Sequence, residues 1–277
     1  MEIAVIGLGL IGGSICKAIK KNTNHLVYGF DIDTQVLESA IKSKAIDKIL
    51  DDVDLPNVDV TFVCLYPLET IDYVKNNLNN FKEDSIVADV CGVKKYIVDE
   101  IEELLLSNGI NFIPTHPMAG REFSGFEYSD EKIFERASFI IAKTPKSSKD
   151  SIEKVKVLAK DMGFASVVIT TPEEHDKTIA FTSQLAHVVS NAFVKSPRLL
   201  KYKGFSAGSF QDLTRVAKLN ETMWSKLFML NREDLLVEID ILSEHLNEYK
   251  DALISKDEEK LKQLLKEGRE LKENSEL

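Results

Sequence analysis

The sequence predicts an α/β domain over residues 1–170, followed by an all-helical domain over residues 171–277. In the first part, short runs rich in β-branched residues alternate with longer helical patterns, which is typical of βαβ units on a parallel sheet. After Pro172 we find no convincing strand pattern, and apolar residues recur at three- and four-residue spacing. We therefore expect a parallel sheet covered by helices, and then a helical domain.

The expected strands are short and largely apolar, as in parallel sheets that helices cover on both faces. They span residues 3–6, 26–30, 58–65, 85–88, 110–113, 138–142 and 166–169. The helices between them are expected over residues 11–20, 34–42, 68–77, 93–106 and 148–162. Pro172 and the two glutamates after it predict a helix start, because proline fits a first turn and acidic groups complement the helix dipole. Later helices are expected over residues 233–246 and 261–271.

Composition limits the function classes. The chain has 277 residues, 44% of them hydrophobic, which is ordinary for a globular protein. A net charge of −10 argues against binding to nucleic acid or to an anionic membrane, and a negatively charged substrate would need a local cluster of positive groups. Cys16, Cys64 and Cys91 lack metal-type spacing, so we expect no metal site and reduced thiols in a cytoplasmic protein.

A glycine-rich stretch follows the first expected strand and opens the first expected helix: Gly7-Leu8-Gly9-Leu10-Ile11-Gly12. Glycines at this spacing permit a tight turn, close approach of the backbone to a pyrophosphate, and close packing of helix on strand. Asp31 ends the next strand, where a carboxylate would bind ribose hydroxyls and repel a 2′-phosphate. We predict a Rossmann-type site for NAD rather than NADP. Its residues would be Gly7, Gly9, Leu10, Ile11, Gly12 and Asp31. The alternative is a glycine-rich turn without a nucleotide.

A second polar stretch, His116-Pro117-Met118-Ala119-Gly120-Arg121-Glu122, comes just past the expected strand 110–113. In an open α/β sheet, ligands sit at the carboxyl ends of the strands. A histidine there can accept a proton near neutral pH, which the oxidation of an alcohol requires. By itself the stretch could equally be a turn with a structural histidine.

Six segments occur in an order and at a spacing that resembles the prephenate dehydrogenase family of tyrosine biosynthesis. They are GLGLIGGS from Gly7, DVCGVK from Asp89, HPMAGRE from His116, His175-Asp176, SQLAH from Ser183 and FQDLTR from Phe210. The resemblance runs from residue 1 to about Trp224. It implies NAD-dependent oxidative decarboxylation of prephenate to 4-hydroxyphenylpyruvate, in a homodimer formed through the helical domain.

The resemblance also implies roles for single residues. His116 would be the catalytic base, which accepts the hydroxyl proton as hydride passes to NAD. Arg215 would bind a substrate carboxylate, for which a planar guanidinium is well suited. Glu122 would lie near that arginine and limit access to the site. The further substrate-binding residues would be His187, Ser183 and Gln184.

Most of these residues have a simpler interpretation. Arg215 could form an exposed i, i+3 pair with Asp212. His187 lies in an apolar helical stretch, where a hydrogen-bonded core histidine is the default. Asp176 could serve only the dipole of its own helix, and His175 beside it is expected at the surface.

Two positions depart from the family pattern. Gly92 stands where the family often has serine, so a hydroxyl that could orient His116 or the nicotinamide is missing. Gln184 stands where the family often has histidine. These departures leave open the choice between prephenate and its amino analogue, arogenate.

Two further alternatives come from other classes. A β-hydroxyacid dehydrogenase would use a lysine on the first long helix of the second domain, where Lys177 is available. A dinucleotide sensor without turnover would need the glycine loop, but it would not explain why His116, His187 and Arg215 occur together.

Overall fold

The structure is a computed structural model that describes residues 1–51, 54–121, 123–201 and 204–275. It divides into two compact units. The first unit comprises Met1–Ile179 and Asn220–Leu230, and the second comprises Ala180–Leu219 and Asn231–Leu277. The domain boundary between residues 170 and 171 stays a prediction. In the described chain no helix is long and apolar enough to cross a membrane.

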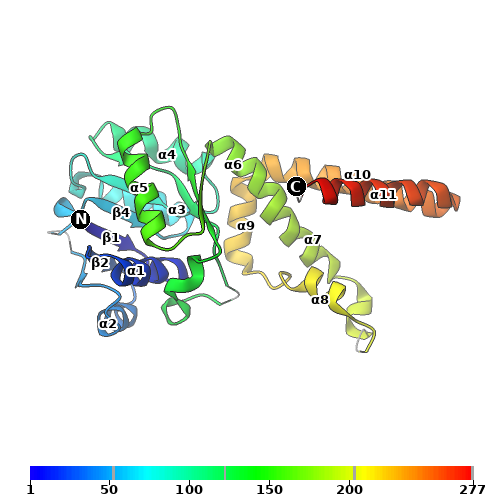
Figure 1. The fold of residues 1–277 in the computed structure, drawn as a ribbon, viewed down its shortest axis with the longest axis horizontal. Helices are drawn as coiled ribbons and strands as arrows, with labels where there is room; N and C mark the ends of the chain where they lie inside the picture. Colours follow the sequence, from blue (N-terminus) through cyan, green and yellow to red (C-terminus); the bar gives the residue numbers. More distant parts are fainter. Residues whose placement is uncertain (52–53, 122, 202–203, 276–277) are drawn as a thin grey trace. The chain divides into compact units, whose positions relative to one another are not determined.

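A six-stranded parallel sheet forms the centre of the first unit (Figure 1). Its strand order is β3-β2-β1-β4-β5-β6, so the chain moves to the opposite side of β1 after β3. In such sheets the ligand crevice lies at this switch point. The strands are β1 (Glu2–Ile6), β2 (Leu26–Phe30), β3 (Lys48–Ile49), β4 (Val60–Val63), β5 (Ile86–Asp89) and β6 (Asn111–Phe112). The register pairs Ile6 with both Phe30 and Val63, so these strands end at one level.

Two apolar cores cover the two faces of this sheet. One contains Ile3 and Val5 with residues of α1, α2 and α5, and the other contains Ala4 and Ile6 with residues of α3 and α4. Alternating side chains of β1 therefore face opposite layers, as a strand requires. The helices are α1 (Leu10–Asn22), α2 (Thr34–Lys42), α3 (Pro67–Asn76), α4 (Lys95–Leu106) and α5 (Lys149–Asp161). The predicted fold class, a Rossmann-type domain with a helical C-terminal part, is confirmed.

The strand predictions were wrong in one respect, because β8 (Ser138–Ala142) and β9 (Ser166–Thr170) do not join the large sheet. They form a second sheet with β7 (Thr115–Pro117), which runs antiparallel to β8. His116 pairs with Ile140 inside β7, so it does not lie in a loop beyond a strand as predicted. The proline of β7 is tolerated because β7 is an edge strand.

Helices make up the rest of the described chain. α6 (Pro172–Ile179) and α9 (Glu221–Leu230) belong to the first unit. The second unit contains a π-helical turn (Ala180–Leu185), α7 (Ala186–Phe193), α8 (Gly208–Thr214), α10 (Arg232–Ser255) and α11 (Glu258–Asn274). Short 3-10 helices occur at Leu55–Asn57, Leu78–Asn80, Phe126–Tyr128, Glu131–Phe134 and Pro197–Lys201. No strand follows β9 within the described residues, as predicted.

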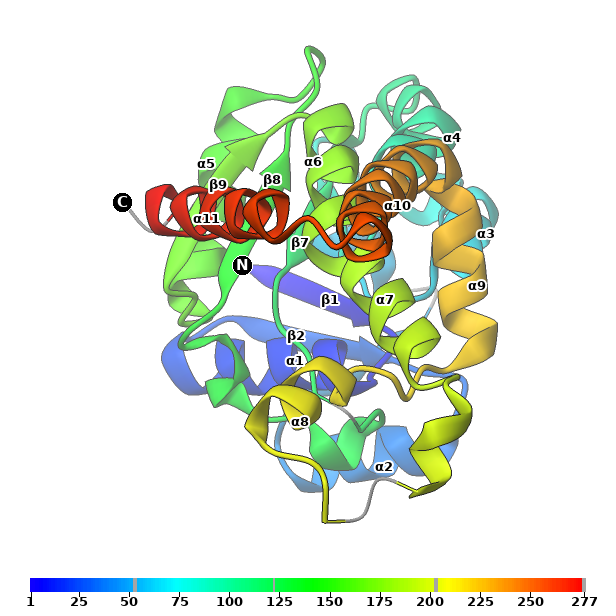
Figure 2. The ribbon, with the colours of Figure 1, turned by 90° about the vertical axis from the view of Figure 1, so that its right-hand side faces the viewer.

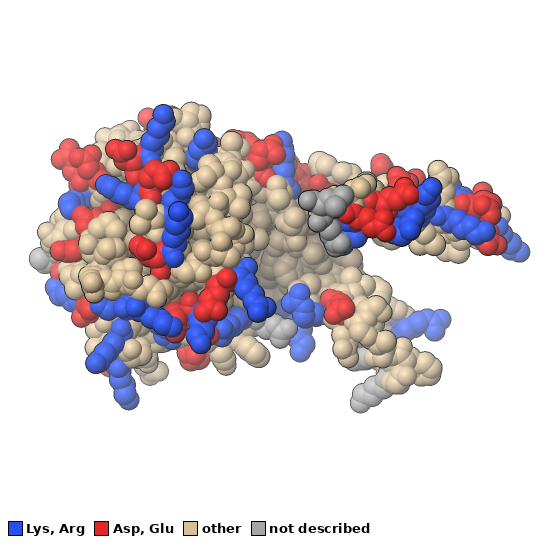
Figure 3. Space-filling view, viewed as in Figure 1, with Lys and Arg blue, Asp and Glu red and all other residues tan. Residues whose placement is uncertain are grey.

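α10 and α11 form a hairpin in the second unit. Lys256 ends α10 in the left-handed conformation, and the Asp257 side chain caps α11 by accepting a hydrogen bond from the Lys260 backbone N–H at 2.9 Å. The two helices leave this turn in different directions (Figure 2). Acidic and basic side chains lie side by side over the hairpin on the face shown in Figure 3, and Lys262 pairs with Glu259 at 2.9 Å.

Candidate active site

The glycine loop between β1 and α1 has the geometry that a dinucleotide requires. Gly7 has a φ of +86°, and a Cβ there would lie 2.7 Å from the Cys64 carbonyl oxygen at the end of β4. A Cβ on Gly12 would lie 1.9 Å from the Gly7 carbonyl oxygen, so the first turn of α1 can approach the loop only without a side chain. At Gly9, by contrast, no atom lies within 4 Å of a Cβ position, which leaves room on the outer side of the loop.

The amino end of α1 is available to an anion. Gly9 caps the helix without a side-chain hydrogen bond, and the first turn of α1 carries no acidic residue. Unpaired backbone N–H groups and the helix dipole at such an end favour a phosphate. Asp31, after β2, supports the same loop, since one of its carboxylate oxygens accepts the Leu8 backbone N–H at 2.8 Å. The residues present therefore fit a dinucleotide.

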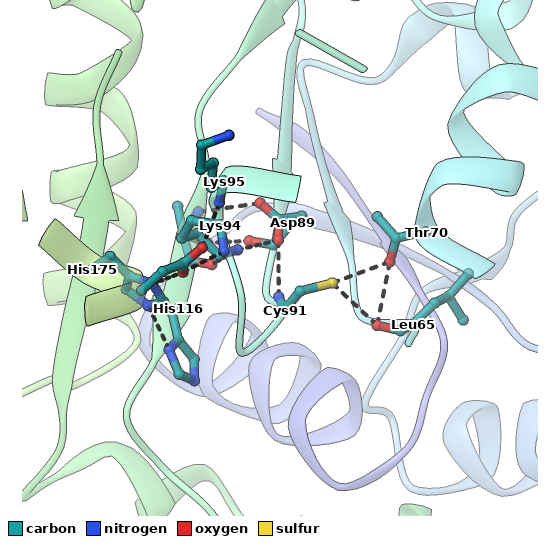
Figure 4. A network of polar contacts seen from close by, with 10 residues as sticks. Leu65, Thr70, Asp89, Cys91, Lys94, Lys95, His116 and His175 are labelled. Carbon is teal, nitrogen blue, oxygen red and sulfur yellow. Dashed lines mark hydrogen bonds and ion pairs between the residues drawn. The ribbon is translucent and has the colours of Figure 1, made fainter. Parts of the chain in front are cut away.

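His116 is one member of a chain of three polar side chains (Figure 4). Its Nδ1 lies 2.9 Å from Nε2 of His175, and Nδ1 of His175 lies 2.7 Å from Oδ1 of Asp176. All three residues belong to the first unit. His116 is half-buried, whereas His175 and Asp176 are each 2% exposed.

Two predictions for His175 and Asp176 were wrong. His175 is not a surface residue, because it lies between His116 and Asp176. Asp176 does not serve only the dipole of its own helix. Its two oxygens accept the backbone N–H groups of Lys94 and Lys95, both at 2.8 Å, and so cap α4. The position of His175-Asp176 directly after a proline-led helix start gave no sign of these contacts, since Asp176 bonds to residues 81 and 82 positions earlier and His175 to one 59 positions earlier.

The backbone of His116 is held from its other side by a buried ion pair, which sequence reasoning missed. Lys94 and Asp89 are fully buried and bond directly through Nζ and Oδ2. Nζ of Lys94 also donates to the Thr115 carbonyl oxygen at 2.7 Å, and the Thr115 hydroxyl donates to the Asp89 carbonyl oxygen. These bonds connect three segments next to His116: the end of β5, the turn that precedes α4, and the strand β7.

The surroundings of His116 favour its neutral form. Loss of water around the ring holds the pKa of His116 well below its usual value, and His175 and the Lys94 charge lower it further. Burial also lowers the pKa of His175, although the hydrogen bond to Asp176 opposes this shift. A neutral imidazole at neutral pH can act as a proton acceptor.

Gly92 leaves space beside the same ring. A Cβ at this position would lie 3.9 Å from Nε2 of His116 and 3.8 Å from Cδ2 of Leu227, both ordinary van der Waals distances. The residue that departs from the family pattern therefore lies directly against the nitrogen that does not contact His175. A Cβ at position 92 would contact the imidazole. The serine hydroxyl that the family often has at this position would therefore belong to the site, and this chain lacks it.

In the second unit, the structure brings His187 and Arg215 near each other. Nδ1 of His187 donates to the Val216 carbonyl oxygen at 3.2 Å, and the Asn191 side chain donates to the Ala217 carbonyl oxygen at 3.1 Å. Burial lowers the pKa of His187, and the charge of Arg215 lowers it further against the opposing effect of the Val216 bond. α7 thus fastens the segment that follows Arg215.

Arg215 is exposed and lines a surface hollow of the second unit, together with Ser206, Phe210, Gln211, Asp212 and Thr214. Asp212 lines the same hollow, and no ion pair between it and Arg215 occurs among the described residues, so the simpler interpretation of Arg215 is not observed. A guanidinium in this setting is accessible to an anionic ligand.

The remaining predicted substrate residues differ in their surroundings. Ser183 is half-buried in the π-helical turn. Gln184 is 2% exposed, and its Oε1 accepts a hydrogen bond from Asn231 at 2.9 Å. Glu122 lies outside the described residues.

The fold and the glycine loop define a class, the dinucleotide-binding oxidoreductases that combine a Rossmann-type domain with a helical domain. Two family models narrow this class. Residues 15–169 match the nucleotide-binding domain of prephenate dehydrogenase, and residues 171–267 match its dimerization domain. The chain therefore belongs to the prephenate dehydrogenase family, as the resemblance of its motifs predicted.

Individual relatives agree with this assignment. The prephenate dehydrogenase of Bacillus subtilis is 29% identical over 98% of this chain and 75% of its own length. The cyclohexadienyl dehydrogenase of Zymomonas mobilis is 27% identical over 96% of this chain and 93% of its own. Among solved structures, the Aquifex aeolicus prephenate dehydrogenase in complex with hydroxyphenyl propionate and NAD⁺ has a TM-score of 0.88 at 29% identity, covering 99% and 98% of the two chains.

Proposed function

We propose that this protein is an NAD-dependent prephenate dehydrogenase, which converts prephenate to 4-hydroxyphenylpyruvate and carbon dioxide. One observation carries the proposal. His116, a half-buried histidine whose surroundings keep it neutral, belongs to the same unit as a dinucleotide loop, and a Cβ on Gly92 would fit at 3.9 Å from its Nε2. A neutral imidazole near a nicotinamide site is what the oxidation of a secondary alcohol needs.

The protein supplies the base and orients the substrate. Bound NAD⁺ supplies the hydride acceptor. His116 accepts the proton of the substrate hydroxyl on Nε2 as the C–H bond of the same carbon is broken. The electrons of the bond to the ring carboxylate move into the ring, which becomes aromatic as carbon dioxide leaves. Because aromatisation makes this reaction strongly downhill, the protein mainly has to orient the ring and remove the proton.

The substrate carries two carboxylates, and the chain has a net charge of −10, so local positive charge must hold it. We assign Arg215 to one carboxylate, because its guanidinium is exposed in the hollow between α8 and its flanking segment. We assign His187 to the same substrate-binding group: its Nδ1 donates to the Val216 carbonyl oxygen, and the charge of Arg215 lowers the pKa of its ring. Ser183, Gln184 and Glu122 keep the substrate-binding roles that the family resemblance implies.

For the cofactor, we assign the loop residues named from the sequence, Gly7, Gly9, Leu10, Ile11 and Gly12, to the pyrophosphate. Asp31 would bind the adenine ribose and disfavour NADP, because a carboxylate repels a 2′-phosphate. Its support of the Leu8 N–H leaves lone pairs on both oxygens for ribose hydroxyls. NAD is thus the cofactor that the site fits, in agreement with the prediction.

Arogenate remains the alternative substrate, because it differs from prephenate only by an amine in place of the side-chain ketone. The relative named cyclohexadienyl dehydrogenase keeps this alternative open. A β-hydroxyacid dehydrogenase is less well supported. Its lysine would be Lys177, which is exposed and pairs with Glu174 at 3.5 Å.

One experiment tests both substrate and cofactor. The purified full chain is mixed with prephenate or arogenate, each with NAD or NADP, and the absorbance of the reduced cofactor is followed. We expect the highest kcat/KM for prephenate with NAD. Faster turnover of arogenate would reassign the substrate, and NAD binding without turnover of either compound would favour a sensor.

We further propose a cytoplasmic homodimer that forms through the helical domain. The described cysteines are free, as in a reducing compartment. Leu246, Leu253 and Ile254 of α10 are each 60% exposed or more, so this helix offers large apolar side chains that a second copy of the chain would cover. Light scattering during gel filtration should give twice the mass of one chain, and Leu253→Glu should shift it toward that of one chain.

A further inference from the structure

We propose that His175 and Asp176 act together as positioning residues, which fix the proton of His116 on Nδ1 and leave Nε2 as the only basic nitrogen of the ring. The inference rests on the proposed function, in which His116 is the base. It adds the reason why this imidazole faces the substrate with the correct nitrogen deprotonated.

Asp176 can only accept hydrogen bonds at this position. Its Oδ1 accepts the Lys94 N–H and its Oδ2 accepts the Lys95 N–H, each at 2.8 Å. Two backbone donors at the amino end of α4, together with the helix dipole, stabilise the ionised carboxylate. A carboxylate has no proton to donate. The contact between Oδ1 and Nδ1 of His175, at 2.7 Å, therefore requires a proton on that nitrogen.

The proton on Nδ1 of His175 determines the next contact. In a neutral imidazole the second nitrogen, here Nε2, is an acceptor. It lies 2.9 Å from Nδ1 of His116, which must then be the donor. The opposite arrangement would turn a lone pair of His175 toward the carboxylate. Burial and the nearby Lys94 charge lower the pKa of both rings, so neither is a cation at neutral pH.

The result is a lone pair on Nε2 of His116, on the side of the ring that faces Gly92. There a Cβ would lie 3.9 Å from Nε2, an ordinary van der Waals distance, so glycine at position 92 leaves room for a carbon atom beside this nitrogen. When a substrate hydroxyl gives its proton to Nε2, the imidazolium keeps its Nδ1–H bond to His175. The negative charge of Asp176 then stabilises that cation through the intervening ring. No other proton needs to move.

The charged groups that face the pair are Lys94, which lowers the pKa of both rings, and its ion-pair partner Asp89, which opposes that shift at His175. The orienting hydroxyl that the family pattern has at position 92 would reach the ring from the Nε2 side. In this chain the ring instead contacts His175 on its Nδ1 side, at 2.9 Å, and Gly92 places no side chain against Nε2.

The tautomer can be measured without any turnover. Full-length protein labelled with ¹⁵N in its histidines is studied by NMR at neutral pH, and the signals of His116 are assigned by their loss in His116→Asn. We expect His116 to carry its proton on Nδ1, with Nε2 in the chemical-shift range of an unprotonated nitrogen. A proton on Nε2 would overturn the proposal. His245→Gln, at an exposed histidine that pairs with Glu248 at 2.9 Å, is the control that should leave the His116 signals unchanged.

Kinetics separate a positioning role from a merely structural one. We expect His175→Phe to lower kcat by about 10- to 100-fold with little change in the KM for NAD, by analogy with the partners that orient metal-bound histidines. His175→Gln, whose side-chain oxygen can still accept from Nδ1 of His116, should recover part of this loss. In a His116→Asn background, His175→Phe should cause no further loss. An equal loss in both backgrounds would show that His175 only supports the fold and would overturn the proposal.

The two failures are distinguishable. A wild-type protein that turns over neither prephenate nor arogenate contradicts the proposed function, while the tautomer seen by NMR still decides the inference. Conversely, an active enzyme with the Nε2-protonated tautomer retains the function and removes the inference. If His175→Phe does not fold, Asp176→Asn provides the second variant. Its amide should allow the His175 ring to flip, so the Nδ1–H signal of His116 should be lost or split.

Discussion

Gly92 lies against the imidazole of His116, so that a Cβ on it would be 3.9 Å from Nε2. Its φ is not in the left-handed region, and no neighbour of such a Cβ would be closer than 3.8 Å. The glycine is therefore required neither by the backbone nor by packing. It leaves space at the nitrogen that we assign as the base.

This relationship predicts opposite outcomes for two substitutions. Gly92→Ala should change the melting temperature by no more than about 2 °C, because the added methyl makes only ordinary contacts. Gly92→Leu, whose side chain extends over Nε2, should lower kcat/KM about 100-fold by displacing the substrate. Thermal melts and initial rates with prephenate check both. Wild-type kcat/KM in Gly92→Leu would mean that the substrate approaches His116 from another side.

His116→Asn should lower kcat by a factor of about 10² to 10⁴, since it removes the group that accepts the hydroxyl proton. The Kd for NAD should stay at the wild-type value, because His116 is not part of the glycine loop. Single-turnover rates and a calorimetric NAD titration give the two quantities. His245→Asn, on the exposed side of α10, is the matched control. Unchanged turnover in His116→Asn would rule out this histidine as the base.

The pH dependence of kcat/KM should show a single acidic limb. The base works only when neutral, so activity is lost as pH falls through the pKa of His116. Because burial, His175 and the Lys94 charge hold that pKa well below 6.5, the limb should lie at more acidic pH than an ordinary histidine would give. Above pH 6.5 the rate should be level with respect to this group. A limb centred above pH 7 would contradict the assigned environment.

Two glycines of the nucleotide loop should respond differently. Gly12→Ala places a methyl 1.9 Å from the Gly7 carbonyl oxygen, so it should destabilise the first unit by about 3 kcal/mol or more. Gly9→Ala meets no atom within 4 Å and should leave the protein folded, but its methyl enters the space assigned to the pyrophosphate. We expect its Kd for NAD to rise at least about tenfold. Urea unfolding and NAD titration separate the two effects, and NAD affinity at the wild-type level in Gly9→Ala would place the pyrophosphate elsewhere.

Arg215→Ala should act mainly on substrate binding. Loss of a charged hydrogen bond to a carboxylate costs about 1.5–3 kcal/mol, which corresponds to a KM for prephenate raised by about 10- to 100-fold. The KM for NAD should not change. Lys218→Ala, at an exposed cation three residues later, controls for the loss of one positive charge. If both variants raise the KM equally, general electrostatics and not a specific contact holds the substrate.

The helices were largely predictable from the sequence because their signals are local. The helix at residues 34–42 has the predicted bounds, since Asp33 caps it within its own first turn by accepting the Gln35 N–H at 2.8 Å. The glycine loop was predictable for the same reason. Its requirements, a positive φ at Gly7 and the close approach at Gly12, are met within one turn of chain.

The partners of His116 were not predictable in this way. β7 has three residues and ends in a proline, so it shows neither alternation nor a strand-like run, and it exists only because β8 pairs with it. Asp176 bonds to the amino end of α4, 81 and 82 residues earlier in the chain, and His175 beside it contacts His116, 59 residues earlier. In the sequence His175 follows two glutamates in a charged first turn, which is typical of an exposed position.

The double hydrogen bond from Lys94 and Lys95 to Asp176 also has a consequence for protein engineering. A graft of residues 110–122 into another scaffold would transfer the imidazole but not the carboxylate that decides which of its nitrogens bears the proton. The position of that proton depends on the start of α4 and on the first turn of α6. A transplanted site would therefore need three separate segments of chain, and a library that varies only the histidine strand would sample the wrong protonation pattern as readily as the correct one.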